Sequence, residues 1–266
     1  MRGYRKDIVG IKELSASERA KLAQELFRLN QRIFDGVEQE EFERLVIKPS
    51  ARWTRIQVIR NGDGDAVGYC AVHMFEIVLS GRTYAVFRGQ AGILRAYRGE
   101  GSTFAFGFRE AIRYKLMHPL ERVYFFCTPI HPSSFHLLAK QFHEIYPSHR
   151  KQTPPVIRAL MHKLADAFGE RRVDADNPDI LQVGWITQDS ADETTFWQTN
   201  SNPDIQLFMK VNPGYRQGHG LLTLVPLTLG NLFFTVIALA KRKLFALLHL
   251  GNAGVKTKRD KSVLHK

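Results

Sequence analysis

The spacing of apolar residues near the start of the chain predicts two helices. Ser15 and Glu18 match the capping box that begins many helices. An apolar stripe at helical spacing follows, made of Leu22, Leu26, Leu29 and Ile33. A shorter helix is expected over residues 37–46, with Phe42 and Leu45 on its apolar side. Both helices present packing surfaces, and we assign no chemistry to them.

Alternation of apolar and polar residues then predicts three consecutive strands. Residues 53–60 alternate with a period of two, and the run Asn-Gly-Asp-Gly-Asp over residues 61–65 is a strong hairpin signal. A long, half-apolar return strand covers residues 66–79. A turn at residues 80–82 leads into a further strand over residues 83–94. We expect these strands to form an antiparallel meander.

The last of these strands leads into a glycine-containing basic turn and then into a helix. The turn has the sequence RGEGST (residues 98–103), and an apolar stripe follows it at Phe104, Phe108, Ile112 and Leu116. Unpaired backbone N–H groups and the positive end of a helix dipole favour an anion at such a place. Residues 90–118 therefore predict a phosphate-binding turn between a strand and a helix.

Strand and helix patterns continue after this turn. Residues 122–127 (RVYFFC) form a continuous apolar run, typical of a strand covered on both faces. A helix over residues 133–142 is expected to begin at a serine cap, and another runs from about Thr153 to near Gly169. His131 lies before the first of these helices, in a loop between Pro129 and Pro132.

Two further strands are expected to close the sheet. Residues 177–202 are polar and irregular, apart from a short strand at residues 180–186. Residues 205–211 form a strand candidate. Residues 221–228 would be the last strand and would pair with residues 205–211.

The chain ends in an apolar segment followed by a basic tail. Residues 221–240 carry no charge over 20 positions, which is long enough for a membrane span. Pro226, Gly230 and Asn231 interrupt this run, so we expect a helix that begins at Gly230 or Asn231 and reaches Leu250. Three placements are open for this helix: on an anionic membrane surface, in a core or dimer interface, or across a membrane.

The net charge of the chain is concentrated near its end. The formal charge of +12 favours an anionic partner. Residues 241–266 hold eight basic residues and one acid, which is +7 of that total. A basic surface over the whole protein is therefore not implied, and we expect no nucleic acid as a partner because no nucleic-acid module is recognisable.

The cysteine content and the first residues bear on the compartment. Cys70 and Cys127 lie within apolar, strand-like runs. Two cysteines are too few for a zinc cluster or a disulfide framework, and they suit a reducing compartment. The first ten residues lack the apolar run of a signal peptide. We expect a cytoplasmic protein without a metal site.

Two segments, ILRAYRGEGST (residues 93–103) and HPSSFHLLAKQF (residues 131–142), carry a resemblance to a known family. With the order of elements around them, residues 15–146 resemble the GNAT superfamily of acyl-CoA-dependent N-acyltransferases. Arg98 and Gly101 match the family's turn pattern, while Thr103 is bulkier than the usual glycine or alanine. The resemblance implies an α/β (α+β) fold: a mixed, mostly antiparallel central sheet flanked by helices, here with an apolar C-terminal helix.

The resemblance also implies a site for the acyl donor. Strand amides would pair with the pantetheine arm of coenzyme A, and amides of the glycine turn would hold the pyrophosphate. The residues implied in donor binding are Ile93, Leu94, Arg95, Arg98, Gly99, Glu100, Gly101, Ser102 and Thr103. The co-substrate would be acetyl-CoA or a longer acyl-CoA, and an amine would attack its carbonyl directly.

The general acid and base are less defined by the resemblance. Many family members place a tyrosine where this chain has Leu138. His131 and Tyr146 are candidates to replace it, with His136 as a further one. Glu76 is the candidate base, and His73 is its alternative.

These observations predict a GNAT-like acyltransferase domain over residues 1–229 and an apolar helix with a basic tail over residues 230–266. The expected activity moves an acyl group from acyl-CoA, or from an acyl carrier protein, to an amine. The apolar end suggests a long acyl chain or an amphiphilic acceptor, and a peripheral position on the inner face of an anionic membrane. The alternative is a non-catalytic protein of the same fold that binds acyl-CoA or acts as a membrane-associated regulator.

Overall fold

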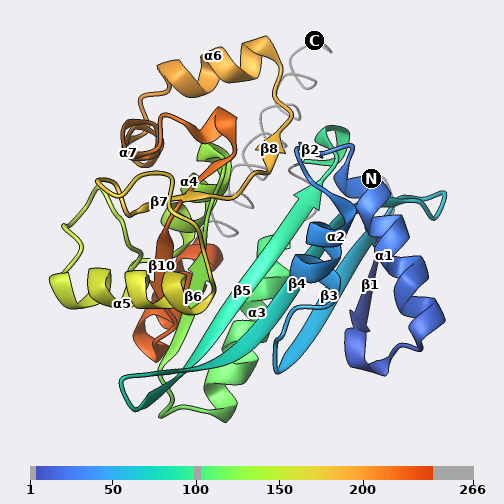
Figure 1. Ribbon diagram of the computed structural model, residues 1–266, viewed down its shortest axis with the longest axis horizontal. Coiled ribbons are helices and arrows are strands. Elements are labelled where there is room, and N and C mark those ends of the chain that lie inside the picture. The colour runs from blue at the N-terminus through green and yellow to red at the C-terminus, as the bar shows by residue number, and fades with distance from the viewer. Residues whose placement is uncertain (1–3, 99–102, 242–266) are drawn as a thin grey trace, which may run out of the picture.

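The computed structural model describes residues 4–98 and 103–241, and within them a six-stranded sheet forms the centre of the molecule (Figure 1). The strand order is β1-β3-β4-β5-β6-β10. Neighbouring strands are antiparallel except β5 and β6, which are parallel. The strands are β1 (Arg5–Gly10), β3 (Trp53–Arg60), β4 (Ala66–Leu79), β5 (Arg82–Ile93), β6 (Val123–Cys127) and β10 (Thr223–Pro226). The expected mixed, mostly antiparallel sheet is confirmed.

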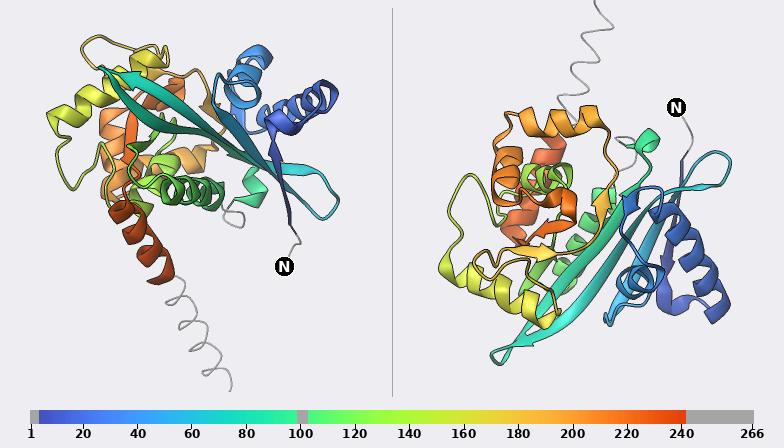
Figure 2. Two further views of the ribbon diagram at one scale, coloured as in Figure 1. Left: turned by 90° about the horizontal axis from the view of Figure 1, so that it is seen from below. Right: turned by 45° about the horizontal axis from the view of Figure 1, so that its top comes forward.

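Helices cover both faces of the sheet. One face carries α1 (Ala16–Asn30), α2 (Gln39–Phe42), the π-helical turn η2 (Glu43–Ile47) and α5 (Pro155–Ala167). The other face carries α3 (Thr103–Met117), and its core cluster includes α4 (Pro132–Gln141) and α7 (Pro203–Val211). Figure 2 shows α1 and α3 on opposite sides of the strands.

Short elements connect these layers. Two small sheets form from β2 (Phe34–Asp35) with β8 (Ile186–Thr187), and from β7 (Ile180–Gln182) with β9 (His219–Leu221). The remaining elements are η1 (Ile11–Glu13), η3 (Arg95–Tyr97), α6 (Ala191–Thr199) and η4 (Tyr215–Gln217). Through them, the second half of the chain covers one end of the central sheet.

Local sequence signals account for the first half of the fold. The Ser15 hydroxyl accepts the Glu18 N–H at 3.3 Å, and the Glu18 carboxylate accepts the Ser15 N–H at 2.9 Å, so the capping box begins α1 as predicted. At the β3–β4 hairpin, the Asn61 side-chain oxygen accepts the N–H of Asp65 at 2.8 Å. The three predicted strands of the meander are confirmed. They could be predicted because the turns that join them depend on only a few neighbouring residues.

The parallel strands β5 and β6 part soon after they meet. In the described residues their register covers Ala85–Phe87 against Val123–Phe125, and β5 continues to Ile93 with β4 as its strand partner. Beyond this point β6 runs beside β10 instead. Figure 1 shows the two strands diverging toward the top of the view. The divergence leaves one edge of β5 without a neighbouring strand.

Residues 205–211, expected as a strand, belong to helix α7. The Asn202 side chain caps this helix by accepting the N–H of Asp204 at 3.0 Å, and Pro203 occupies its first turn. Ile205 and Phe208 then share its buried face. The strand prediction was wrong because a short apolar run suits either element, and here the cap decides. The strand formed near residues 221–228, β10, therefore pairs with β6.

The region expected to be irregular contains a helix. Ser190 and Glu193 form a capping box that begins α6. The single strand expected at residues 180–186 is divided into β7 and β8, with Gly184 between them at φ +85°. The cap of α4 is the side chain of His131, not a serine.

The C-terminal helix begins within one or two residues of its expected start. Residues 229–241 are helical, and the extension to Leu250 lies outside the described residues. The Asn231 side chain is 3% exposed, donates to the Glu144 and Pro226 carbonyls at 2.8 Å and accepts the Glu144 N–H at 3.0 Å. Asn231 thus anchors the helix, which projects from the body in Figure 2. Within residues 4–98 and 103–241, no helix has the length and apolarity needed to cross a membrane.

Candidate active site

The open edge of β5 presents backbone groups to the gap between β5 and β6. The Ala85 N–H donates to the Arg122 carbonyl at 2.9 Å, which marks the edge of β5 that faces β6. Successive residues of a strand direct their backbone groups to opposite edges. Gly89, Ala91 and Ile93 share the parity of Ala85, so their N–H and C=O groups face the gap. This edge is suited to pair with an extended ligand.

Leu94 does not share this edge. Its N–H donates to the Val67 carbonyl at 2.9 Å, so the amide role expected for Leu94 is corrected. Ile93 keeps an amide directed to the gap, and Thr103 is the first residue of α3. Four residues of the expected turn lie outside the described part of the chain: Gly99, Glu100, Gly101 and Ser102.

Two arginines that follow β5 converge on one carboxylate. Glu193 lies 3.1 Å from Arg95 Nε and 3.7 Å from Arg98 Nη1, measured to the same Oε1 atom. Arg95 also donates to the Ser190 hydroxyl at 3.0 Å. The first turn of α6 therefore lies against the segment between β5 and α3. Guanidinium groups placed together in this way also suit phosphate.

A buried polar group lies where β6 leads into α4. The His131 side chain is 3% exposed and its Nε2 lies 2.7 Å from Asp189 Oδ2. Its Nδ1 lies 2.6 Å from the Ser133 hydroxyl and 3.2 Å from the Ser133 backbone nitrogen. The backbone N–H can only donate, so Nδ1 carries the lone pair and Nε2 carries the hydrogen. Asp189 thus holds the His131 ring so that the lone pair of Nδ1 is directed at Ser133.

Aromatic rings enclose this group. The rings of Trp197 and Tyr215 meet the His131 ring edge-on, with centroids at 5.3 and 5.9 Å. The Tyr215 hydroxyl and Asp189 Oδ1 are buried and have no hydrogen-bond partner in the described part of the chain. Burial, and secondarily the Asp189 charge, raise the pKa of Tyr215, so it stays protonated and able to donate. Sequence reasoning singled out His131 alone, since the partners come from segments distant in sequence.

The two other expected catalytic residues lie elsewhere. Glu76 is on β4 opposite Ala85 and forms an ion pair with Arg52. The Tyr146 hydroxyl donates to Glu144 Oε1 at 2.6 Å, and the ring belongs to the core cluster beneath α5. Neither Glu76 nor Tyr146 has a partner in common with His131 among the described contacts, so the structure does not bring the three together.

A chain of buried polar groups crosses the sheet on the face that carries α1. His73 Nδ1 lies 2.9 Å from the Thr54 hydroxyl, and its Nε2 lies 2.7 Å from Gln90 Oε1. His73 is 1% exposed. Burial, opposed by the hydrogen bond to Gln90, lowers the pKa of His73 from 6.5 to about 4. His73 is therefore a neutral structural group at neutral pH.

Comparison with known proteins gives matches in structure alone. No protein-family model and no curated protein sequence matches the chain. Arabidopsis thaliana NAA60 in complex with acetyl-CoA matches with 13% identity and a TM-score of 0.35, over 84% of this chain and 98% of that one. A GCN5-related N-acetyltransferase from Kribbella flavida matches with 10% identity and a TM-score of 0.34, over 83% and 97%.

A further match spans a smaller share of both proteins. It is a probable N-acyltransferase from Enterococcus faecalis V583, with 17% identity and a TM-score of 0.36, over 50% of this chain and 31% of that one. All three TM-scores lie below 0.4.

The arginine pair gives a first prediction for the donor site expected from the sequence. Glu193→Gln is expected to tighten coenzyme A binding about three- to tenfold, because a competing carboxylate leaves Arg95 and Arg98. Glutamine also serves at this position of a capping box, so α6 keeps its start. Titration calorimetry with coenzyme A measures the effect. Pantetheine, which lacks the phosphates, is the control and should bind both proteins equally; weaker coenzyme A binding by the variant would contradict the prediction.

His73 gives a prediction for the pH dependence of stability. The unfolded chain takes up a proton near pH 6.5, whereas folded His73 does so near pH 4. Stability is therefore complete above pH 6.5 and falls as the pH drops through 4, by about 3 kcal/mol in all. Urea unfolding of the wild type and His73→Gln at pH 7, 5 and 4 measures this loss. The variant should lose less; an equal loss in both would assign the pH dependence to other groups.

The cysteines do not supply a nucleophile. Burial raises the pKa of Cys70 to about 12 and raises that of Cys127 further. Both are therefore protonated thiols, which are weak nucleophiles. Within residues 4–98 and 103–241, no three His, Cys, Asp or Glu side chains are placed to hold a metal ion.

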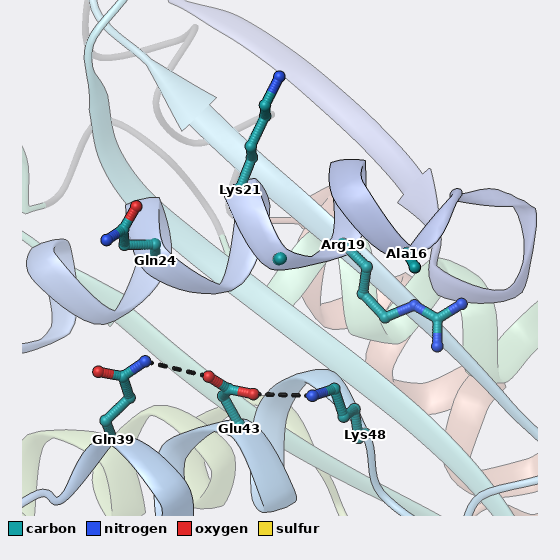
Figure 3. A pocket seen from close by; sticks show the side chains of 8 residues that line it. Ala16, Arg19, Lys21, Gln24, Gln39, Glu43 and Lys48 are labelled. Carbon is teal, nitrogen blue, oxygen red and sulfur yellow. Dashed lines mark hydrogen bonds and ion pairs between the residues drawn. The ribbon is translucent and has the colours of Figure 1, made fainter.

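A groove of about 440 Å³ lies between α1 and α2, away from the residues described above (Figure 3). Glu43 crosses it, accepting from Gln39 at 3.1 Å and from Lys48 at 2.9 Å. Arg19 and Lys21 of α1 form part of the other wall. None of the residues expected from the sequence as site residues lines this groove.

Proposed function

We propose that this chain transfers an acyl group from an acyl-CoA thioester to an amine. The open edge of β5 carries the proposal. Gly89, Ala91 and Ile93 direct backbone groups into the gap left by β6, where the amides of a pantetheine arm would pair as an added strand. Arg95 and Arg98, at the end of the same strand, would meet the phosphates. The thioester would then lie in the gap between β5 and β6.

His131 is the proposed general base at this gap. It lies four residues beyond the end of β6, and the contact of 2.7 Å between its Nε2 and Asp189 holds the ring so that Nδ1 faces Ser133. An amine that attacks a thioester must lose a proton, and a positioned imidazole can accept it. Tyr215 keeps its proton and would donate a hydrogen bond to the departing thiolate. These roles replace the tyrosine that the family pattern places where this chain has Leu138.

Incubation of the full chain with acyl-CoA and a panel of amines tests the proposal. Acetyl-, octanoyl- and palmitoyl-CoA, and an acyl carrier protein thioester, are offered as donors with polyamines, amino acids and peptides as acceptors. Thiol release that depends on the amine, with the amide identified by mass spectrometry, is the expected result. Thermal stabilisation by coenzyme A without turnover would favour the non-catalytic alternative. Neither stabilisation nor turnover with any donor would overturn the proposal.

The C-terminal helix supports a finer proposal, that this acyltransferase works at an anionic membrane surface on long-chain or amphiphilic substrates. Leu229, Phe233, Phe234 and Val236 are between 46% and 62% exposed on this helix. The basic residues of the sequence from Lys241 onward follow it. Exposed apolar side chains followed by positive charge are typical of helices that lie on anionic lipid.

Vesicle flotation tests the membrane proposal. A chain shortened after Leu229 would lose the buried anchor Asn231, so point variants are preferred. Phe233→Ser combined with Phe234→Ser is expected to reduce flotation with vesicles containing 30% phosphatidylserine at least about fivefold, because two exposed rings are lost. Leu120→Ser, at a turn elsewhere where the side chain is 98% exposed, is the control. Equal flotation of the wild type and the double variant would contradict this placement.

A further inference from the structure

Ser133 lies at the end of a short hydrogen-bonded chain. Its hydroxyl oxygen is 2.6 Å from His131 Nδ1, and His131 Nε2 is 2.7 Å from Asp189 Oδ2. The His131 and Asp189 side chains are 3% and 8% exposed, whereas Ser133 is half-buried. The base and the carboxylate are thus shielded from water, and Ser133 is the member of the three that is partly exposed.

The direction of the hydrogen bonds follows from the backbone. The Ser133 N–H donates to Nδ1, which must therefore be unprotonated. The Ser133 hydroxyl, bonded to the same nitrogen, donates its hydrogen to Nδ1 as well. On the other side of the ring, Nε2–H donates to Asp189. The serine proton is therefore already directed at a base whose opposite nitrogen faces a carboxylate.

Capping of α4 does not account for this arrangement. A cap needs an acceptor for one backbone N–H, and His131 Nδ1 supplies it without any partner at Nε2. Asp189 comes from a segment 58 residues later. Burying its carboxylate costs several kcal/mol, and its Oδ1 finds no partner in the described residues. A carboxylate kept in such a position is typical of an orienting group in a nucleophile–base pair.

We propose that Ser133 is a nucleophile that carries the acyl group as an ester between the thioester donor and the acceptor. The inference rests on the proposed function and deepens it, since it replaces direct attack by the amine with two successive transfers. It assigns His131 as the base of both steps and Asp189 as the positioning residue that keeps Nδ1 free.

In the first step, the Ser133 oxygen bonds to the thioester carbonyl carbon while its proton passes to His131 Nδ1. The carbon–sulfur bond then breaks, and the thiolate takes the proton from His131 and leaves as coenzyme A thiol. In the second step, the amine nitrogen bonds to the ester carbon and loses its proton to His131. The carbon–oxygen bond breaks and Ser133 regains that proton. No oxidant, metal or further reactant is needed.

The start of α4 favours the charge that develops in both steps. Ser133 is in the first turn of this ten-residue helix, after Pro132 at its first position. The positive end of the helix dipole therefore lies beside the oxygen that becomes negative. Without an amine, water would attack the ester, so slow thioester hydrolysis is expected as a by-product.

Mass spectrometry of the intact full chain and of its peptides tests the inference. The wild type is mixed with acyl-CoA in the absence of amine, quenched in acid and digested. The expected result is one acyl group on Ser133, and labelling of the same residue by a fluorophosphonate. Ser133→Ala should lose both signals and slow amide formation at least about a hundredfold. Ser134→Ala, at the exposed neighbour, is the matched control and should keep both signals.

Two readouts separate this inference from the proposed function. If Ser133→Ala keeps its fold by circular dichroism and forms amide within about threefold of the wild-type rate, direct attack is established and the inference is overturned while the acyltransferase proposal stands. If the wild type forms neither amide nor acyl-serine with any donor, both are overturned. If acyl-serine forms, Asp189→Asn should slow its appearance and leave coenzyme A binding unchanged, as a positioning residue requires.

Discussion

Replacement of His131 with asparagine is expected to lower kcat for amide formation by about two to four orders of magnitude. Asparagine is among the best residues for beginning a helix, so α4 keeps its cap while the titratable imidazole is lost. Neither direct attack by the amine nor the route through Ser133 then has a base. KM for acyl-CoA should change little, because His131 is not among the residues proposed to hold the phosphates.

The His131 variant requires a control for stability. Asp189 loses its hydrogen-bond donor, so a decrease of about 1–3 kcal/mol in the free energy of unfolding is expected, and rates are measured at 25 °C on protein shown to be folded. His136→Asn, on the same helix, is the control. It removes a histidine that is hydrogen-bonded to Asp204 at 3.2 Å, so the free energy of unfolding should decrease by a comparable amount. Equal kcat for both variants, or kcat within threefold of wild type for His131→Asn, would exclude His131 as the base.

Phe126→Ala is expected to lower the free energy of unfolding by about 3–5 kcal/mol. Phe126 lies on β6 and is 0% exposed. Its ring stacks on Phe168 with centroids at 5.5 Å, and the Arg88 guanidinium lies 5.3 Å from its centre. Removal of the ring leaves a cavity beneath a guanidinium that also pairs with Glu170 at 2.5 Å. The surrounding strands cannot collapse into this cavity without moving that ion pair.

Urea unfolding measures the effect of Phe126→Ala. Leu120→Ala is the control, because Leu120 is 98% exposed and its truncation should change the free energy by no more than about 0.5 kcal/mol. An equally small change for Phe126→Ala would mean that the packing between β6 and α5 does not support the sheet. Because Phe126 lies where β6 diverges from β5, the variant should also bind acyl-CoA more weakly than the wild type.

The first half of the fold could be predicted from the sequence because its signals are local. The Ser15–Glu18 box and the Asn61 hairpin act over a few residues, and each appears in the structure where the sequence places it. The same holds for β5 and α3, which lie on either side of residues 99–102, a segment outside the described residues. Errors occurred where two elements fit one pattern, as at residues 205–211, where the cap at Asn202 outweighs the apolar run.

The candidate site could be predicted only on its donor side. A strand followed by a basic glycine turn indicates where an acyl donor would lie, but the alternation of backbone groups shows that Ile93 faces the gap and Leu94 does not. That distinction depends on the register with β4. The two-residue turn at Ser80 and Gly81 fixes this register, whereas the sequence placed the turn only within residues 80–82.

The sequence by itself determined the meander, the expectation of a basic glycine-containing turn and the apolar end, since each depends on residues that are neighbours along the chain. Only the tertiary structure decided which groups surround His131. Asp189 and Tyr215 reach it from segments separated from it by helices and loops. No periodicity along the chain relates such positions. They come together only when the second half of the chain packs beside the place where β5 and β6 separate.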